Sequence, residues 1–214
     1  MIIAGARGFA KELLQVYYRD FSKENIYFFD NINICDDDKI YGQFDLINTN
    51  ENLKLLLKKD NEFALGIGTP KNRKTLYDLF IEIGGKPISI ISKKANIGYF
   101  GTTIGDACSI VDGVIITNDV KIGKGTLLNL NCTVGHDSVI GCFCDISPNV
   151  NISGNCTIRN YCSIGTGAVI IPGITIGEHV TIGAGSVITK DIAKNSVVVG
   201  VPGKIIKKKD DFKK

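Results

Sequence analysis

An aliphatic residue recurs at every sixth position along much of this 214-residue chain. Fifteen such anchors, all Ile, Leu or Val, follow one another from Ile104 to Ile188, and Ile91 and Ile97 extend the pattern upstream before a one-residue slip. Neither the period of an α-helix nor the alternation of a simple strand produces this spacing. A hexapeptide period is typical of a parallel β-helix, whose hexads each supply one short strand and one turn. With three hexads per triangular coil, the repeat predicts about five coils.

A second register lies four residues after each anchor, where every residue is small or β-branched. Five of the seven cysteines occupy it, namely Cys108, Cys132, Cys144, Cys156 and Cys162. The chain has no CxxC pair and only two His, so we interpret these cysteines as small buried hydrophobic residues and predict no metal site. Gly often directly follows an anchor, as Gly123 and Gly141 do, and we expect these positions to require torsions that Gly tolerates.

The first ninety residues alternate between strand and helix patterns. We expect strands at 2–4, 26–30, 63–68 and 86–91, and helices after the turn at 5–8, at 51–59 and from 69–70 to 84–85. This alternation predicts a small parallel sheet of Rossmann type. The expected domains are therefore a nucleotide-binding unit at 1–90, a β-helix at 91–206 and a basic tail at 207–214.

Charge and hydropathy exclude some partners. The formal net charge is +3, and most of the excess lies after residue 203, so the body is nearly neutral and a nucleic-acid-binding role is not expected. No apolar run is long enough to span a membrane, and the first residues lack the long apolar region of a signal peptide. These features predict a cytoplasmic protein with no membrane partner.

The turn Gly5-x-x-Gly8 between the first strand and helix has two interpretations. It is not the GxGxxG of dinucleotide-binding enzymes. A strand, a glycine turn and a helix N-terminus nonetheless form a suitable phosphate site, and Asp30, at the end of the second strand, suits a ribose hydroxyl or a base N–H. Alternatively, Gly5 and Gly8 only make a tight turn and Asp30 only caps a strand.

Two further features carry a family resemblance. The ending IGAGSVITKDIAKNSVVVGVPGKII resembles the closing coil and GxPxK exit of acetyl-CoA-dependent hexapeptide acyltransferases. With a Rossmann-like unit in front, the whole chain resembles the PglD/NeuD-like acetyltransferases. The resemblance implies a left-handed β-helix, a homotrimer with acetyl-CoA between neighbouring prisms, and N-acetylation of a nucleotide-linked amino-deoxysugar, commonly at a 4-amino group. Some relatives O-acetylate sialic acid.

The stretch GHDSVIG contains His136 and Asp137. A sugar ammonium must lose a proton before its nitrogen attacks a thioester, and a neutral imidazole accepts a proton near neutral pH. The resemblance implies that His136 is this base, that Asp137 orients its ring, and that a backbone N–H near Gly154 stabilises the oxyanion. The alternative is a solvated surface His. His179, 43 residues on, is expected on another face of the prism and at the surface.

The resemblance also assigns binding residues. The nucleotide-sugar residues that it implies are Arg7, Gly8, Phe9, Asp30, Asn31 and Gly68, and the acetyl-CoA residues are Asp145, Thr166 and Ala184. Asp145 stands where many relatives carry a second His that contacts acetyl-CoA, so this contact is expected to differ. Arg73 is a candidate for holding the diphosphate. Lys207–Lys209 either pair with CoA phosphates or form a solvated tail.

Three other functions were weighed. An O-acetyltransferase acting on sialic acid or another sugar would use the same base. A non-catalytic nucleotide-sugar-binding protein would not need the GHD site. A β-helical carbonic anhydrase needs three His on zinc, but this chain has two, predicted on different faces. The sequence does not indicate which nucleotide, UDP, dTDP, GDP or CMP, carries the sugar.

Overall fold

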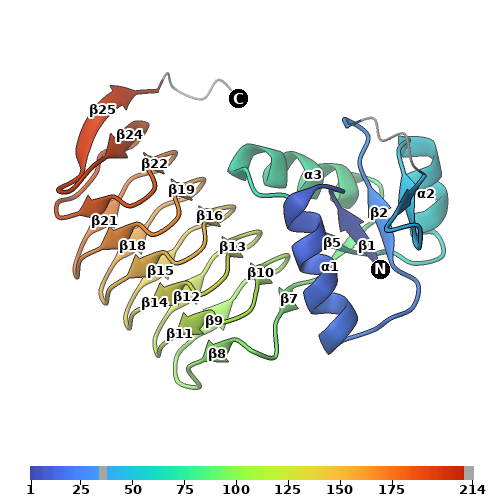
Figure 1. Cartoon of the computed structure of the whole chain (residues 1–214), viewed down its shortest axis with the longest axis horizontal. Helices are drawn as coiled ribbons and strands as arrows, with labels where there is room; N and C mark the ends of the chain where they lie inside the picture. Colours follow the sequence, from blue (N-terminus) through green and yellow to red (C-terminus); the bar gives the residue numbers. More distant parts are fainter. Residues whose placement is uncertain (34–37, 210–214) are drawn as a thin grey trace.

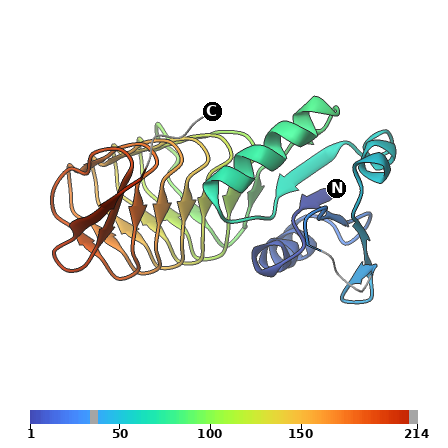
Figure 2. The same ribbon diagram turned by 90° about the horizontal axis from the view of Figure 1, so that it is seen from above.

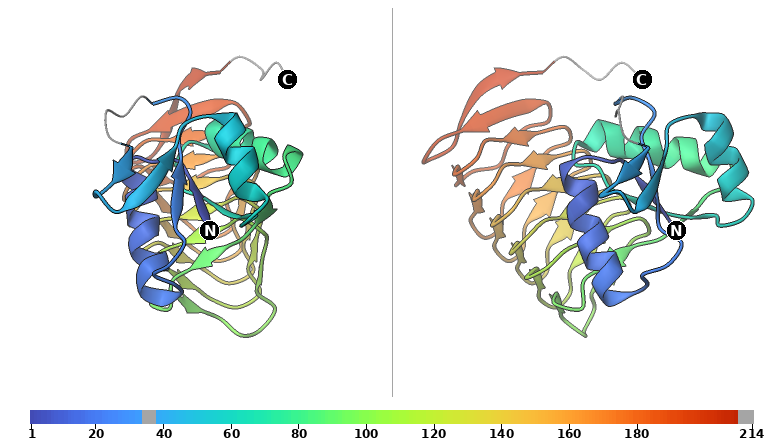
Figure 3. Two further views of the ribbon diagram at one scale, coloured as in Figure 1. Left: turned by 90° about the vertical axis from the view of Figure 1, so that its right-hand side faces the viewer. Right: turned by 45° about the vertical axis from the view of Figure 1, so that its right-hand side comes forward.

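Two kinds of sheet make up the chain, and they follow one another in sequence (Figure 1). The computed structural model describes residues 1–33 and 38–209. An α/β unit comes first, and a left-handed parallel β-helix follows it as a long prism. The α/β unit lies beside the first coils of the prism and not beside its last ones (Figures 1 and 3). Both predicted architectures are therefore confirmed.

The α/β unit is built on a six-stranded sheet with the order β3-β4-β2-β1-β5-β6. Its strands are β1 (Ile2–Ala4), β2 (Tyr27–Phe29), β3 (Lys39–Ile40), β4 (Phe44–Ile47), β5 (Glu62–Leu65) and β6 (Lys86–Pro87). All neighbouring pairs are parallel except β3 and β4, which form an antiparallel hairpin. The sequence analysis missed this hairpin because its strands are too short to show an alternating pattern.

Three helices cover the sheet: α1 (Gly8–Asp20), α2 (Asn50–Leu57) and α3 (Pro70–Glu82). Helix α1 buries Leu13 against one face, together with Ile3 and Phe28. Helices α2 and α3 pack on the opposite face, where Leu53 and Phe80 are fully buried. Helix α3 begins with Pro70, which suits the first position of a helix because no hydrogen bond is lost there.

The segment expected as one strand at 86–91 is divided between the two parts of the chain. Strand β6 belongs to the α/β sheet, whereas Ile90 and Ile91 form the first strand of the prism. The backbone N–H of Ile88 still bonds to Phe63, while that of Ile90 bonds to Cys108 in the next coil. The chain thus passes from sheet to prism within two residues.

The prism has three faces. Face 1 holds β7 (Ile90–Ile91), β10 (Ser109–Ile110), β13 (Leu127–Leu128), β16 (Asp145–Ile146), β19 (Ser163–Ile164), β22 (Thr181–Ile182), β24 (Ser196–Val199) and β25 (Lys204–Lys208). Face 2 holds β8 (Asn96–Ile97), β11 (Ile115–Ile116), β14 (Thr133–Val134), β17 (Asn151–Ile152), β20 (Val169–Ile170) and β23 (Val187–Ile188). Face 3 holds β9 (Thr103–Ile104), β12 (Lys121–Ile122), β15 (Val139–Ile140), β18 (Thr157–Ile158) and β21 (Thr175–Ile176).

From β9 to β20 each strand pairs with the strand 18 residues on, so these coils stack in register; the first pairs, such as β7 with β10, are 19 residues apart, and β22 and β24 are 16 apart. Strands β7 to β21 make five complete coils, in agreement with the repeat count, and β22 and β23 begin a sixth. Anchors such as Ile110, Ile116 and Ile122 point into the prism and are buried. In Figure 2 the coils are seen stacked along one axis, with α3 running from the α/β sheet toward them.

The glycines that follow the anchors have a different role from the one expected. A Cβ on Gly123 would lie 2.5 Å from the carbonyl carbon of Gly141 in the next coil. Such glycines are therefore required by close stacking of coils, not by their torsions. The left-handed torsions fall two residues later, for example at Gly125, Asn131 and Asp137, with φ of 68°, 58° and 58°. Asn and Asp tolerate this region better than other residues with a Cβ.

The five repeat cysteines are buried, as predicted: Cys108, Cys132, Cys144, Cys156 and Cys162. Burial raises the pKa of the Cys108 and Cys132 thiols to about 11. A thiol with a raised pKa remains protonated at neutral pH and is a poor nucleophile. These residues therefore serve as small core side chains. Cys35 lies outside the described residues.

Candidate active site

Three strand ends meet at one edge of the α/β sheet. Strands β1, β2 and β5 are adjacent and parallel, so Gly5, Asp30 and the loop 66–68 follow them at the same edge. Gly5 has φ of 117°, and a Cβ there would lie 2.7 Å from the carbonyl oxygen of Gly66. Only Gly fits this position. In an open parallel sheet the carboxyl edge is where ligands bind.

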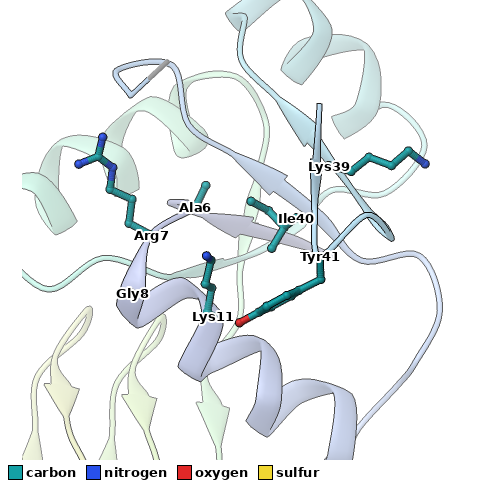
Figure 4. Close-up of a pocket in the computed structure, with 7 residues that line it drawn as sticks. All are labelled: Ala6, Arg7, Gly8, Lys11, Lys39, Ile40 and Tyr41. Atoms are coloured by element: carbon teal, nitrogen blue, oxygen red, sulfur yellow. The ribbon is translucent and has the colours of Figure 1, made fainter. Parts of the chain in front are cut away.

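A basic pocket of about 320 Å³ opens beside the first of these strand ends (Figure 4). Its lining residues are Ala6, Arg7, Gly8, Lys11, Lys39, Ile40 and Tyr41. Arg7 and Gly8 were predicted to bind substrate. The sequence analysis did not identify Lys11, Lys39 and Tyr41, because two of them lie on the unpredicted hairpin.

The electrostatics of this pocket favour an anion. Helix α1 has no acidic residue in its first turn, and Arg7 makes no side-chain cap. The positive end of the helix dipole therefore adds to the charges of Arg7 and Lys11, whereas the Lys39 ammonium is paired with Asp45 at 3.0 Å. The Lys11 ammonium lies 5.3 Å from the centre of the Tyr41 ring, in a cation–π contact that holds the hairpin against α1.

The other predicted substrate residues are placed differently. Asp30 is buried, and its carboxylate accepts hydrogen bonds from the backbone N–H of Ile32 and from the backbone and side chain of Asn33. It thus shapes the turn after β2, as the strand-cap alternative expects. Asn31 is exposed and donates to Asn50, while Phe9 packs partly buried against the α1 side of the core.

Arg73 does not hold a diphosphate. It is fully buried in α3, and its guanidinium donates to the carbonyl oxygens of Leu65, Ile67 and Gly125 and to the Ser109 hydroxyl. The first two acceptors belong to the α/β unit and the other two to the prism. Burial lowers the pKa of Arg73 to about 10, so it stays charged at neutral pH. Arg73 joins the two parts of the chain, and the diphosphate hypothesis is wrong.

His136 and Asp137 form a close pair on a turn of the prism. The Nδ1 atom of His136 lies 2.7 Å from the Asp137 carboxylate, and the two side chains are 64% and 55% exposed. An ionised carboxylate can only accept a hydrogen bond, so the contact places the ring proton on Nδ1. The lone pair of Nε2 is then free to accept a proton, as a general base requires.

The ring of His136 rests on Gly154 in the next coil. A Cβ on Gly154 would lie 2.7 Å from Nε2 and 2.8 Å from Cε1 of the imidazole. The backbone N–H of Asn155 also donates to the His136 carbonyl oxygen, at 2.8 Å. The imidazole is thus fixed by Asp137 on one side and by a bare backbone on the other. A solvated surface His would need neither.

The predicted acetyl-CoA residues lie in two places on face 1. Thr166 and Ala184 are exposed on successive coils, at the edge where face 1 meets face 2, and the Gly185 N–H donates to the Thr166 carbonyl. Asp145 begins β16 and faces the loop after β5, because a Cβ on Gly68 would lie 3.3 Å from its carboxylate. The structure therefore brings together Gly68 and Asp145, which were assigned to different ligands.

His136 lies across the prism from these residues. It follows β14 on face 2 and precedes β15 on face 3, so it lies on the edge opposite face 1. The α/β unit packs on face 1, through contacts such as Arg73 with Ser109 and Gly68 with Asp145. A single chain therefore does not place the predicted base next to the predicted substrate pocket.

Solved structures resemble the chain over nearly its full length. One is PerB from Caulobacter crescentus in complex with CoA and GDP-perosamine, with 25% identity, a TM-score of 0.88 and 96% coverage of both chains. Another is the acetyltransferase domain of PglB from Neisseria gonorrhoeae with acetyl coenzyme A, with 26% identity and a TM-score of 0.85. WeeI from Acinetobacter baumannii has 27% identity and a TM-score of 0.86. For the last two, coverage is 96% of this chain and 98% of theirs.

Family models match both parts of the chain. Residues 1–80 match the PglD N-terminal domain, and residues 155–190 match the bacterial transferase hexapeptide family with its six repeats. In both of its parts the chain is therefore similar to the PglD-like hexapeptide acyltransferases. The predicted family and the predicted enzyme class are both confirmed.

The second histidine of this PglD-like acyltransferase has a packing role. His179 lies on a different edge from His136, as predicted, but it is only partly exposed, and its ring stacks on Tyr161 with centres 4.9 Å apart. Burial lowers its pKa. The stack continues from Tyr161 to Phe143 and on to Tyr77 of α3. His179 is thus a partly exposed residue that also packs on its neighbour.

The basic C-terminal segment is also more ordered than expected. Lys207 and Lys208 lie in β25, which pairs with β24, so the strand crosses the boundary predicted at 206. Lys209 donates to the His179 carbonyl and the Thr181 hydroxyl, and Lys208 to the Ser196 hydroxyl. Lys208 and Lys209 thus hold the C-terminal segment of the PglD-like fold against its last coil. Residues 210–214 lie outside the described residues.

Residues 1–33 and 38–209 contain neither a metal-binding cluster nor a membrane-spanning helix. No group of three or more His, Cys, Asp or Glu side chains there could hold a metal ion. No helix there is long and apolar enough to cross a membrane.

Proposed function

We propose that this acyltransferase moves an acetyl group from acetyl-CoA to the amino group of a nucleotide-linked amino sugar. The observation that carries the proposal is the His136–Asp137 pair, whose free Nε2 is held over Gly154. The ligands named for two solved relatives, CoA with GDP-perosamine and acetyl coenzyme A, support the donor and the acceptor class.

The proposed chemistry is direct transfer. The amine nitrogen attacks the thioester carbonyl, Nε2 of His136 accepts the proton that the nitrogen loses, and the CoA thiolate leaves. Asp137 stabilises the imidazolium that forms, because its carboxylate accepts the Nδ1 proton. Cys144 and Cys156 are not nucleophiles in this scheme, since burial raises the pKa of both thiols.

The residues present fit acetyl-CoA, which supplies the activated acyl group. Thr166 and Ala184 offer exposed backbone on successive coils, as an extended pantetheine arm would need. The N–H of Gly154 has no hydrogen-bond acceptor among the described residues. It lies beside His136 and is therefore available to an oxyanion that forms there.

The nucleotide is proposed to bind at the carboxyl edge of the α/β sheet. In this pocket Arg7 and Lys11 offer positive charge to a diphosphate, at the N-terminus of α1. Gly68 lies at the same edge and next to Asp145 of the prism. A sugar extending from this pocket would therefore point toward face 1.

A homotrimer is part of the proposal. His136 and the substrate edge lie on opposite sides of one prism, so the site is incomplete within a single chain. A second copy can bring its His136 edge to face 1 of the first. Cyclic symmetry then gives every copy one complete site, and a prism with three faces suits a closed ring of three.

The test is a screen of GDP-, UDP-, dTDP- and CMP-linked amino sugars with acetyl-CoA, while released thiol is measured. We expect one amine to be acetylated and His136→Gln to lower kcat on the order of 10²–10⁴-fold, with acetyl-CoA affinity nearly unchanged. Sialic acid and hydroxyl sugars test the O-acetyltransferase alternative. Turnover only with hydroxyl acceptors, or near wild-type turnover by His136→Gln, contradicts the proposal.

A further inference from the structure

Asp145 is a carboxylate at the junction of the two parts of the chain. It is the first residue of β16 on face 1, and its neighbour across the junction is Gly68, in the loop that follows β5. A side chain at position 68 would contact the Asp145 carboxylate. With Gly at this position, only the backbone of the loop lies next to the carboxylate. Asp145 thus faces the carboxyl edge of the α/β sheet.

This carboxylate has no hydrogen-bond partner among the described residues. The nearest cation is Arg73, which attracts it. However, the Arg73 N–H groups are already directed at Gly125, Leu65, Ile67 and Ser109. Burial therefore raises the pKa of Asp145. A partly buried carboxylate without a donor is unusual, since most buried polar groups are paired.

The carboxylate nonetheless remains open to a ligand. Neither oxygen of Asp145 belongs to the fully sealed, unpaired side-chain atoms among the described residues. Both Asp145 oxygens therefore keep contact with solvent. The residue is only partly buried, and the loop after β5 packs against it at Gly68.

Asp145 also lies between the two proposed ligands. On one side is the strand edge proposed for the nucleotide. On the other, Ser163 pairs with Asp145 in the next coil, and its strand leads directly to Thr166. A sugar bound at the strand edge must pass this position to meet an acetyl group held by Thr166 and Ala184.

We propose that Asp145 binds the protonated amine of the acceptor sugar and positions it before His136 of a neighbouring copy removes its proton. The assignment rests on the proposed function and deepens it. An ammonium supplies both the charge and the donors that this carboxylate lacks, and charge-assisted hydrogen bonds are stronger than neutral ones. A hydroxyl acceptor would supply only a neutral donor. Asp145 is thus a specificity determinant for amines over alcohols.

The experiment compares wild type, Asp145→Asn and Asp145→Ala, with Asp106→Asn as the matched control. Asp106 is an exposed carboxylate of the prism. Calorimetry measures the affinity of each protein for the amino sugar found in the screen, for its 4-hydroxyl counterpart and for acetyl-CoA. Steady-state kinetics separate KM from kcat, and thermal melting checks the fold.

We expect Asp145→Asn to weaken amino-sugar binding on the order of 10–100-fold and to raise KM similarly, because Asn keeps an acceptor oxygen but loses the charge. Binding of the hydroxyl counterpart and of acetyl-CoA should change less than threefold, and Asp106→Asn should resemble wild type. Asp145→Ala should likewise weaken binding of the amino sugar more than binding of the hydroxyl counterpart. The ratio of these two affinities does not depend on the overall stability of the variant.

Three results would overturn the assignment. Equal losses for amine and hydroxyl sugars would mean that Asp145 only shapes the junction. A loss confined to acetyl-CoA would place it in the donor site. Unchanged affinities would remove it from binding altogether. In each case an active wild type leaves the proposed function standing, whereas a wild type that acetylates no amine overturns both.

Discussion

At the scale of single residues, the position of His136 is set by its two neighbours in space. Asp137 has the left-handed φ of 58°, which turns the chain and carries its carboxylate to Nδ1 of the preceding ring. Asp tolerates this torsion, so one residue provides both the turn and the hydrogen bond. Gly154 provides the surface on which the imidazole rests. A general base must be held in line with the proton that it accepts, because a small displacement of the base lowers the reaction rate strongly.

Gly154→Ala tests this support directly. The new methyl would lie 2.7 Å from Nε2, so the ring must leave its position. We expect kcat to fall on the order of 10²-fold with little change in acetyl-CoA affinity. The control is a double-mutant cycle with His136→Ala, in which Gly154→Ala should have almost no further effect. Additive losses would show that Gly154 acts independently of His136.

At the scale of elements, two arginines attach the helices of the α/β unit to the prism. Arg73 of α3 reaches carbonyl oxygens on both sides of the junction. Arg19, at the end of α1, bonds to both oxygens of Asp112 at 2.7 and 2.8 Å, and to its neighbour Asp20. Helix periodicity shows neither contact, since each depends on where the helix docks. The orientation of the substrate pocket relative to face 1 follows from these two attachments.

Arg73→Met should destabilise the protein on the order of 3 kcal/mol. Met fills a similar volume, but it leaves several buried carbonyl oxygens and the Ser109 hydroxyl without their donor. Urea unfolding measures the loss, and Lys71→Met, an exposed position of the same helix, is the control. A change below 1 kcal/mol would show that solvent replaces these hydrogen bonds at no cost.

The Arg19 cluster predicts a sensitivity to acid. Hydrogen bonds from Arg19 lower the pKa of Asp20 to about 2 and also lower the pKa of Asp112. The folded values lie below the unfolded value of about 3.9, so the cluster contributes its full stability above pH 4 and loses it as pH falls toward 2. The melting temperature should drop in this window. Arg19→Met should melt lower at pH 7 and show a smaller further drop in acid; an equal drop would contradict the assignment.

At the scale of the whole molecule, the α/β unit and the prism share their cores. Val111 packs with the α1 side of the sheet, and Ala107 and Phe143 pack with the α2 and α3 side. The α/β unit thus covers face 1 of the first coils. His136 lies on the edge of the prism opposite face 1. This arrangement separates the base from the pocket within one chain. Assembly of several copies would bring them together.

Complementation between inactive chains tests this assembly. His136→Ala lacks the base, and Arg7→Glu reverses a charge in the nucleotide pocket. If each site combines two copies, mixed oligomers contain some sites with both residues intact, so co-expressed variants should recover a measurable fraction of activity. Light scattering should give about three times 23.2 kDa. A fully active protein with the mass of one chain, or no recovery in mixed oligomers, would contradict shared sites.

The sequence by itself determined the repeating parts of this protein. Through most of the prism each hexad contacts the equivalent hexad 18 residues on, so the period predicts the prism, the inward anchors and the buried cysteines. Strand and helix patterns likewise predicted the parallel sheet and the turn at Gly5, whereas β5 ends at Leu65, three residues before the predicted end at Gly68. The HD pair was recognisable from the family resemblance; a turn position alone does not indicate function, because His179 is also at a turn and stacks on Tyr161.

Only the tertiary structure decided how these parts meet. Burial of Arg73, the approach of Gly68 to Asp145 and the location of His136 across the prism all depend on docking the α/β unit onto face 1. These contacts join residues that have no periodic relation in sequence, and no local pattern records them. The division of 86–91 between two sheets has the same origin, since hydrogen-bond partners 18 or more residues away determine where one strand ends and the next begins.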